Sequence, residues 1–584
     1  MTTELATLLD QIDIVAGPTG DRMMAATSIL QAESGCVLEV EALIPELSSA
    51  IRGGEQAVDA RRAAGAFYTP TTLVEFMLTQ TLEPWQHDNA SRLPVILDPS
   101  CGTGRFLLAA GARLVAAHVS STGASSADAW QLIGPHLLGF DSDPLATAWL
   151  RGRITMLAGG KPTAAAGIRT CDAFDESALP SAEVDIVLGN PPFGTPLRKL
   201  GDAELIRKKC AAITGSPLGP YADLAAVFLL LASHALRDRG RLSLVQPLSV
   251  LASRDTQLIR ADLASRCTTV FAWASSVPVF DAHVYTCAIG VHVGVSASKP
   301  TVNRWADLPA RALAPTPPPP SAASWSTLVS AALDVPDPPA IETDGTIGDF
   351  ANATADFRDQ FYGLKGTIVE CPGDLPPGHV PVVTSGVLDV AECAWGVRAI
   401  RLLGEKWTRP AIRLGALSEA MQEWATNRMT AKVMLPTQTR ILEPVLDEQG
   451  QWLPSVPIVS VTAPPQDLAH IAAVLASPLM SLIALHRHLG TARHPQAIKL
   501  SARDVLALPM PSHVTFLHNA AAEFRLAQHA SSDAERVHHL QLSGKCVHDA
   551  FGLSTTDADA VFAWWTSRAP ARTASKQGER SVHT

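Results

Sequence analysis

The stretch V-I-L-D-P-S-C-G-T-G-R-F-L-L-A-A-G-A-R-L-V-A-A-H-V, residues 95–119, decides the fold. Its first part is a short apolar run that ends at Asp98, as expected for a buried β-strand. Its last part, from Phe106, has the apolar periodicity and length of a helix. Between them, Gly102 and Gly104 permit a tight turn and let a ligand approach the backbone closely. A strand, a glycine turn and a helix in this order predict a platform for a nucleotide-like cofactor.

Strand-like and helix-like runs alternate on either side of this stretch, from residue 61 to about residue 295. Such alternation is typical of an α/β fold, here predicted as a Rossmann-like sheet with helices packed on it. The predicted strands cover residues 95–99, 137–141, 184–190, 241–247, 269–274 and 285–293, the last two as an antiparallel pair. The predicted helices cover residues 106–119, 144–159 and 223–240, the third ending at Gly240.

Length and composition indicate a folded chain with more than one domain. The 584 residues exceed what one compact core accommodates, and 47% of them are hydrophobic against 17% charged. The N-terminus has no basic region ahead of an apolar run, and no uncharged apolar stretch reaches the ~18 residues of a membrane span. The nine cysteines are scattered and never spaced as C-x-x-C, which argues against a disulfide framework and a zinc site. We therefore expect a cytoplasmic protein with no metal and no membrane contact.

Composition also divides the chain. Proline removes backbone donors and favours extended chain, so the run A-L-A-P-T-P-P-P-P-S-A-A-S predicts a linker. A mixed α/β domain is expected after it, and helices and a disordered basic-polar tail at the end. The predicted divisions are a helical lead-in (1–60), the Rossmann-like domain (61–297), the Pro-rich linker (298–346), the mixed α/β domain (347–515) and the C-terminal helices with the tail (516–584).

Carboxylates follow the next two predicted strands. Asp141 ends the strand 137–141, where it is able to accept hydrogen bonds from both hydroxyls of a ribose. Asp143 precedes Pro144 and is expected to cap a helix, a structural role. Asp172 lies where a third strand should end, and it either accepts from a cofactor adenine amine or is a solvated loop carboxylate. NAD and FAD domains use a related glycine pattern, and a ligand-free turn is the structural alternative.

The most specific motif is Asn190-Pro191-Pro192-Phe193, which closes the strand 184–190. An exocyclic adenine amine is a poor nucleophile, because its lone pair is delocalised into the ring. The Asn190 amide oxygen and the Pro191 carbonyl are two acceptors that can take both amine hydrogens and restore electron density on the nitrogen. The prolines fix the turn, and Phe193 offers a face for stacking. A simple Pro-Pro turn, the alternative, needs neither an asparagine before it nor an aromatic residue after it.

The order of these motifs resembles that of the gamma-class amino-methyltransferases, the bacterial DNA adenine-N6 methyltransferases. In the turn D-P-S-C-G-T-G, Asp98 and Ser100 match the family's cofactor motif, and N-P-P-F matches its catalytic motif. The resemblance covers residues 61–295 in detail. It implies S-adenosyl-L-methionine as the cofactor, held by the glycine turn, Asp141 and Asp172, and methyl transfer to N6 of an adenine in double-stranded DNA.

Two further segments are similar to that family. The run G-A-F-Y-T-P resembles a motif that contributes Thr69 and Pro70 to the pocket for the methionine end of the cofactor. The segment 275–293 resembles one that supplies a second aromatic ring, and Phe280 matches that position. The resemblance implies that a flipped-out adenine lies between Phe193 and Phe280, since the substrate base must leave the duplex. Without the resemblance, Phe280 is more readily interpreted as an ordinary core residue.

The second half of the chain resembles a target recognition domain, with residues 487–511 similar to the closing stretch of such domains and residues 548–561 to a tail element after them. DNA phosphates attract Lys and Arg, so locally clustered basic residues are candidates for a DNA-binding face, although the net charge of −10 is unfavourable. A solvated charged surface is the alternative for each of them. The candidates are Arg401, Lys406, Arg409, Arg413, Arg428, Lys432, Arg440, His486, Arg487, His488, Arg493, His494, Lys499 and Arg503.

These features predict a site-specific DNA methyltransferase (adenine-specific), monomeric because one chain holds both catalysis and recognition. Residues 1–60 are too short for a nuclease, so we expect a stand-alone modification enzyme of a restriction-modification or phage-defence system, with a separate restriction or defence subunit as a partner. Type I modification subunits share the motifs but fit less well. The alternatives are methylation of an RNA base or a protein glutamine, and a methyltransferase-like protein that binds DNA without catalysis.

Overall fold

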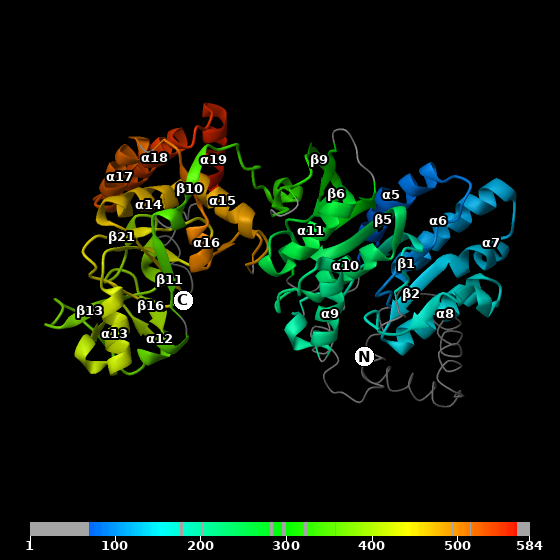
Figure 1. The fold of residues 1–584 in the computed structure, drawn as a ribbon, viewed down its shortest axis with the longest axis horizontal. Helices are drawn as coiled ribbons and strands as arrows, with labels where there is room; N and C mark the ends of the chain where they lie inside the picture. Colours follow the sequence, from blue (N-terminus) through cyan, green and yellow to red (C-terminus); the bar gives the residue numbers. More distant parts are fainter. Residues whose placement is uncertain are drawn as a thin grey trace, which may run out of the picture. The chain divides into compact units, whose positions relative to one another are not determined.

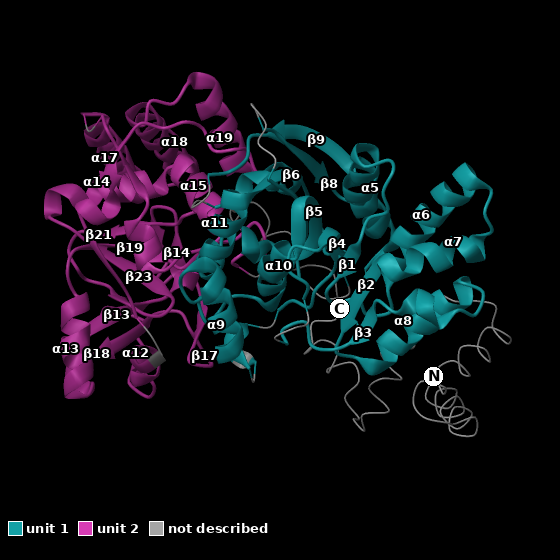
Figure 2. Ribbon diagram, turned by 45° about the vertical axis from the view of Figure 1, so that its right-hand side comes forward, with its two compact units in different colours: residues 1–334 teal, residues 335–584 magenta. Residues whose placement is uncertain are grey.

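The computed structural model divides the chain into two compact units, residues 1–334 and 335–584 (Figures 1 and 2). The structure describes residues 69–568 except 176–178, 195, 201, 281–283, 295–299, 321–323, 357, 493 and 514. Several predictions therefore lie outside the described residues: the helical lead-in 1–60, the first four residues of G-A-F-Y-T-P, the candidate Arg493 and the tail after residue 568.

The first unit contains a nine-stranded sheet. Its strands are β1 (Ile96–Asp98), β2 (Leu137–Asp141), β3 (Ile168–Thr170), β4 (Val184–Gly189), β5 (Leu236–Pro247), β6 (Cys267–Ala274), β7 (Thr286–Val293), β8 (Val302–Ala306) and β9 (Arg311–Thr316). Their order is β3-β2-β1-β4-β5-β7-β6-β8-β9. The strands β3, β2, β1, β4 and β5 are parallel, and β7 is antiparallel to β5 and β6. The chain leaves β1 towards β2 and β3 and returns to β4 on the other side of β1, so the strand order reverses there.

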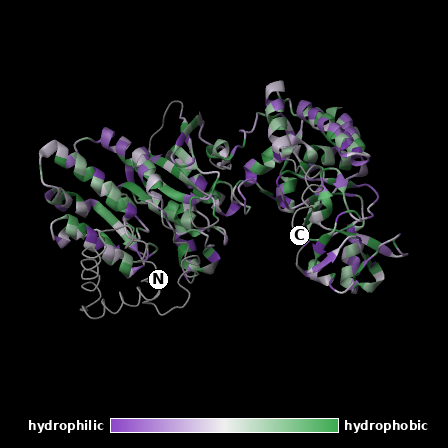
Figure 3. Ribbon diagram, turned by 180° about the vertical axis from the view of Figure 1, so that it is seen from behind, coloured by the Kyte–Doolittle hydropathy of each residue, from purple (hydrophilic) through white to green (hydrophobic). Residues whose placement is uncertain are grey.

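Helices cover this sheet. They are α5 (Thr71–Asp88), α6 (Arg105–Thr122), α7 (Ser126–Ile133), α8 (Pro144–Leu157), α9 (Ala203–Thr214), α10 (Leu224–His234) and α11 (Gln257–Arg266). Helix α5 packs against α6 and the strands β4, β5 and β7, and α10 packs against β5 and α11. All residues of β4 are buried, as expected for a central parallel strand, and hydrophobic residues line the central strands (Figure 3). The predicted Rossmann-like α/β fold is confirmed, including the antiparallel β6–β7 pair.

The helix predicted over residues 223–240 is wrong in its last third. Helix α10 ends at His234, and β5 begins at Leu236. Leu236 pairs with Val184 of β4, so residues 236–240 join the parallel sheet although their sequence has helical periodicity. Gly240, the expected helix stop, lies within the strand.

The first part of the predicted linker 298–346 is not extended chain, because it contains β8 and β9, which extend the main sheet beyond β6. The boundary between the two units, after residue 334, falls within the predicted linker. The buried Arg304 side chain donates from Nε to the carbonyl of Ala314 (2.7 Å) and from Nη1 to that of Thr327 (3.0 Å). The β8–β9 ladder skips Pro315, which has no N–H to donate. Strand pairing and side-chain burial therefore outweigh the effect of the prolines.

The second unit has a mixed α/β fold, as predicted, and contains two four-stranded sheets, in the orders β11-β23-β19-β21 and β12-β18-β13-β22. Its strands are β10 (Thr343–Thr346), β11 (Asn352–Ala355), β12 (Ile368–Glu370), β13 (His379–Val383), β14 (Leu388–Asp389), β15 (Glu392–Cys393), β16 (Ile400–Leu402), β17 (Glu405–Trp407), β18 (Pro410–Arg413), β19 (Lys432–Pro436), β20 (Gln438–Thr439), β21 (Val445–Asp447), β22 (Leu453–Pro454), β23 (Ile458–Thr462), β24 (Ile498–Lys499) and β25 (Pro509–Pro511). Its helices are α12 (Arg358–Gly363), α13 (Glu419–Arg428), α14 (Pro465–Ala476), α15 (Pro478–His488), α16 (Ala502–Leu506), α17 (Thr515–Gln528), α18 (Asp533–Ala550) and α19 (Thr555–Arg568).

The C-terminal helices belong to the second unit. Helix α17 packs against α14 and α18, and α19 packs against α15. In the described part of the chain no single helix is long and apolar enough to cross a membrane, although α14 and α15, bent by 69° at their junction, meet the length and composition requirements together. Both of these helices are largely buried.

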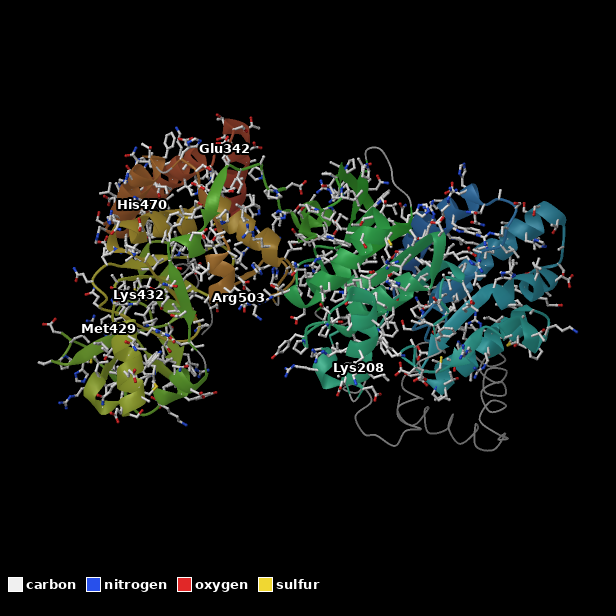
Figure 4. All side chains as sticks on the ribbon, viewed as in Figure 1. Lys208, Glu342, Met429, Lys432, His470 and Arg503 are labelled. Carbon is white, nitrogen blue, oxygen red and sulfur yellow. The ribbon has the colours of Figure 1, made fainter. Side chains whose placement is uncertain are left out.

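Several basic residues proposed for the DNA-binding face have internal partners instead. Lys432 is fully buried, and its ammonium lies 2.6 Å from Asp447 Oδ2 (Figure 4). Arg428 pairs with the mostly buried Asp356 at 2.7 Å. His486 is buried, with Nε2 2.8 Å from the carbonyl oxygen of Pro336. Lys432 and His486 are therefore corrected from surface candidates to structural residues, because sequence shows charge but not burial.

The buried Lys432–Asp447 pair makes a measurable prediction about stability. Lys432→Met leaves the Asp447 carboxylate buried without its cation, so the free energy of unfolding should fall by about 3–5 kcal/mol. Lys406→Met, which removes an exposed cation of β17 in the same unit, should change it by less than about 0.5 kcal/mol. Urea denaturation followed by circular dichroism measures both values, and equal values for the two variants would contradict the assignment.

Candidate active site

The functional residues predicted from the sequence gather at one edge of the first unit's sheet. Asp98 ends β1, Asp141 ends β2, and Asn190 follows β4. The three strands are parallel, so their carboxyl ends lie at the same edge. The strand order reverses between β1 and β4, and such a reversal opens a crevice in which α/β sheets bind their ligands.

The turn between β1 and α6 requires its two glycines. Gly102 and Gly104 have φ angles of +50° and +87°, a region that other residues rarely adopt. A Cβ atom on Gly104 would also lie 2.2 Å from Leu150 Cδ1. The N–H of Gly102 donates to Asp141 Oδ2 at 2.8 Å, so the second strand's carboxylate holds the turn in place.

Asp98 is almost fully buried beneath this turn. Its Oδ1 accepts a hydrogen bond from the Ser100 N–H at 3.1 Å. Burial raises the pKa of Asp98 to about 8, and the nearby Asp141 carboxylate adds to the rise. Gly189 at the end of β4 makes room for it, because a Cβ there would lie 2.6 Å from Asp98 Oδ1. The residue before Asn190 is thus constrained by the carboxyl group on the neighbouring strand.

These groups fit a cofactor that carries a cation and a ribose. The Ser100 hydroxyl is buried and makes no hydrogen bond to any described residue. Asp141 lies at the surface of the turn, where its carboxylate contacts backbone N–H groups of Gly102 and Asp143. Asp172 is exposed after β3, and its Oδ1 accepts from the Phe174 N–H at 2.9 Å. Acidic and hydroxyl groups around a glycine turn offer the hydrogen-bond acceptors and the negative charge that an adenosine with a positively charged substituent requires.

Asp143 and Thr69 have distinct positions. Asp143 caps α8, accepting from the Leu145 N–H at 3.0 Å, which confirms its predicted structural role.

Thr69, immediately before Pro70 and α5, is buried at the site. Its hydroxyl accepts from Asn190 Nδ2 at 3.0 Å, and its carbonyl accepts from Arg105 Nη1 at 2.7 Å. Thr69 therefore connects the N-P-P-F motif to the helix that follows the glycine turn.

A carboxylate that the sequence analysis missed holds the N-P-P-F loop. Asp223 caps α10 through a hydrogen bond from the Ala225 N–H (3.0 Å), and its other oxygen accepts from the Gly194 N–H (2.8 Å). Burial raises the pKa of Asp223 to about 6, although both hydrogen bonds oppose the rise. An Asp before the apolar run of α10 is a recognisable N-cap pattern, but its bond to Gly194 joins residues 29 positions apart and has no local signature.

The two predicted aromatic residues lie together. Phe193 and Phe280 are both buried, and their rings meet edge to face with centroids 5.7 Å apart and planes inclined by 67°. The rings contact each other, so an adenine stacked between them requires that they separate. Pro191 is buried and Pro192 is partly buried between Asn190 and Phe193.

Comparison with known proteins matches this unit to one family. Residues 54–277 match the family model described as N-6 DNA Methylase. The adenine-specific methyltransferase PglX of Streptomyces coelicolor is 32% identical over 124 residues, 21% of this chain and 10% of that protein. The chain thus matches about a tenth of the length of this curated relative.

Two solved structures resemble the fold of most of the chain. The type IIL restriction-modification enzyme MmeI in complex with DNA has a TM-score of 0.59 and 12% identity, covering 90% of this chain and 82% of that one. A nuclease-deletion mutant of the type ISP enzyme LlaGI with a DNA substrate mimic has a TM-score of 0.50 and 12% identity, covering 88% and 61%. The family match covers residues 54–277, and this range includes the glycine turn at residues 98–104 and the N-P-P-F motif at residues 190–193.

Proposed function

We propose that the protein is a site-specific methyltransferase that transfers a methyl group from S-adenosyl-L-methionine to N6 of a flipped-out adenine in double-stranded DNA. The observation that carries the proposal is the hydrogen bond from Asn190 Nδ2 to Thr69, at the crevice where the strand order reverses. This bond fixes the orientation of the Asn190 amide beside the glycine turn. The family match over residues 54–277 supports the same reaction.

The cofactor's sulfonium makes its methyl group electrophilic, which is the chemistry the cofactor supplies when bound. In this proposal Asp141 accepts from the ribose hydroxyls and Asp172 from the adenine amine of the cofactor. Gly102 and Gly104 leave space for the ligand against the turn. Ser100, Asp98, Thr69 and Pro70 hold the methionine end, where buried oxygen atoms favour its positive charge.

The substrate amine is activated by acceptors rather than by a strong base. The Asn190 amide oxygen and the Pro191 carbonyl accept its two hydrogens, which returns lone-pair density to N6. With the cofactor bound, these acceptors would hold N6 so that it could take the methyl group as the carbon–sulfur bond breaks, with one amine proton passing to solvent. Phe193 and Phe280 separate and stack on the two faces of the adenine, while Pro192 keeps the turn rigid. Positioning supplies most of the acceleration.

The second unit is assigned in this proposal to target recognition. Its support is the fold likeness to MmeI over 90% of the chain, in a structure that contains DNA. Phosphate contacts fall to the exposed candidates Arg401, Lys406, Arg413, Arg440, Lys499 and Arg503, since buried or internally paired residues such as Lys432 are not available. We further propose that the enzyme acts as a monomer within a restriction-modification or phage-defence system, with any nuclease on a separate subunit.

Removal of the Asn190 amide tests the reaction. Asn190→Ala should lower kcat by about 10²–10³-fold with little change in KM for DNA, because the acceptor acts on charge that develops in the transition state. The assay follows labelled methyl from S-adenosyl-L-methionine into DNA and identifies the nucleoside by mass spectrometry. Asn303→Ala, at an exposed position of the otherwise largely buried β8, is the matched control and should leave kcat unchanged. Label found in RNA or protein instead of N6-methyladenine would reject the proposed substrate.

Asp98 should give up a proton when the cofactor binds. Its pKa of about 8 keeps the carboxyl largely protonated at pH 7, and a cation placed beside it favours the ionised form. Titration calorimetry in buffers of different ionisation enthalpy should therefore show proton release on binding, and Asp98→Asn should abolish the buffer dependence. Binding enthalpies that are equal in all buffers for the wild type would rule out this role of Asp98.

Asp223 should make the reaction sensitive to mild acid. Below its pKa of about 6 the carboxyl is protonated and one of its two acceptor oxygens is weakened, so kcat should fall between pH 7 and pH 5. Asp223→Asn should have a lower kcat that is flat over the same range. Folding raises the pKa of Asp223 above 3.8, so its ionisation lowers the free energy of unfolding as the pH rises from about 4 to 6. At pH 7.5 the Asp223→Asn variant should therefore be no less stable than the wild type. An unchanged wild-type pH profile in Asp223→Asn would refute this.

A further inference from the structure

The loop after the N-P-P-F motif is bonded to a turn that carries an exposed aromatic residue. The backbone N–H of Leu197 donates to the carbonyl of Ala222 at 2.9 Å, and that of Arg198 donates to the carbonyl of Pro220 at 3.0 Å. Pro196 and Asp223 form an antiparallel bridge beside them. With the bond from Gly194 to Asp223 already described, these contacts tie Gly194 and residues 196–198 of the loop that follows Asn190 to residues 220–223.

Arg198 and Tyr221 form an outward-facing pair on this support. The Arg198 guanidinium lies over the Tyr221 ring, 4.6 Å from its centroid. Tyr221 is 60% exposed, and Arg198 is exposed as well. Tyr221 lies in a turn that is closed by a hydrogen bond from the Ala222 N–H to the Gly219 carbonyl (3.1 Å).

The other cationic side chains described near this loop have partners within the chain. Arg207 donates to the carbonyl of Leu218 (3.3 Å), and Lys209 donates to that of Phe174. Lys208, on the exposed side of α9, is paired with Glu204 at 3.2 Å (Figure 4). Within the part of the chain that the structure describes, Arg198 has no ion pair and no hydrogen bond from its side chain. Its guanidinium retains its planar fork of N–H donors for an external acceptor.

We infer that Arg198, placed over the Tyr221 ring, binds a backbone phosphate of the DNA strand that presents the target adenine. A guanidinium pairs with phosphate through two parallel hydrogen bonds, and stacking on a ring reduces the freedom it loses on binding. A strand whose base reaches Asn190 brings its flanking phosphates to the rim of the same loop. In a chain with a net charge of −10, such a local cation favours approach of DNA to this edge. The inference rests on the proposed function and extends it to the contact beside the catalytic loop.

The test measures binding of a fluorescein-labelled, mixed-sequence DNA duplex as a function of salt. One lost phosphate contact should weaken binding roughly five- to tenfold near 0.1 M salt and reduce the slope of log Kd against log salt by about 0.9. Arg198→Ala should show both changes. Tyr221→Ala should bind about two- to fivefold more weakly, and Tyr221→Phe, which keeps the ring face, should bind like the wild type. Lys161→Ala, an exposed cation that precedes β3, is the control and should change neither quantity.

The outcomes separate this inference from the proposed function. Thermal unfolding of each variant establishes that it is folded, and methyl transfer by the wild type is measured in parallel. If the wild type methylates adenine while Arg198→Ala keeps the wild-type affinity and salt slope, the Arg198 contact is overturned and the function stands. Equal losses in Arg198→Ala and Lys161→Ala also overturn it, since they indicate a general effect of charge. A wild type that neither binds the duplex nor methylates it overturns both.

Discussion

Thr69 accepts two hydrogen bonds on which the geometry of the site depends. Its hydroxyl receives the Asn190 amide, and its carbonyl receives the guanidinium of Arg105, the first residue of α6. Three segments that are distant in the sequence are therefore held at one edge of the sheet, where the strand order reverses. The bond from Asn190 to Thr69 thus ties the amide of the N-P-P-F loop to the residue that also receives the first side chain after the glycine turn.

The same edge contains acidic groups placed at an energetic cost. Asp98 and Asp223 are buried enough that their pKa values rise, which disfavours their ionised forms in the folded protein. Asp98 leaves no room for a side chain at Gly189, and the Gly194 N–H donates a hydrogen bond to Asp223. Groups that reduce stability yet define the position of a loop are typical of sites where function rather than folding selects the residue.

Local patterns in the sequence were sufficient for the α/β class, most strand positions and the residues of the glycine turn and the N-P-P-F motif, because these depend on periodicity and on turn chemistry. They failed where long-range pairing decides the structure. Residues 236–240, at the end of the predicted helix 223–240, became part of β5 through pairing with β4, and β8 and β9 formed within a Pro-rich run. Burial of Lys432 and the Asp223–Gly194 bond likewise depend on residues far away in the chain. The roles assigned to the site residues remain proposals.

We propose that the edge formed by β1, β2 and β4 binds a methyl donor and a flipped adenine. Single-molecule sequencing of DNA from cells that express this chain, beside cells that do not, measures the product of this site. We expect N6-methyladenine at one short sequence motif in the expressing cells only. Genomic DNA with no N6-methyladenine above the control, although the protein is folded and present, would contradict it.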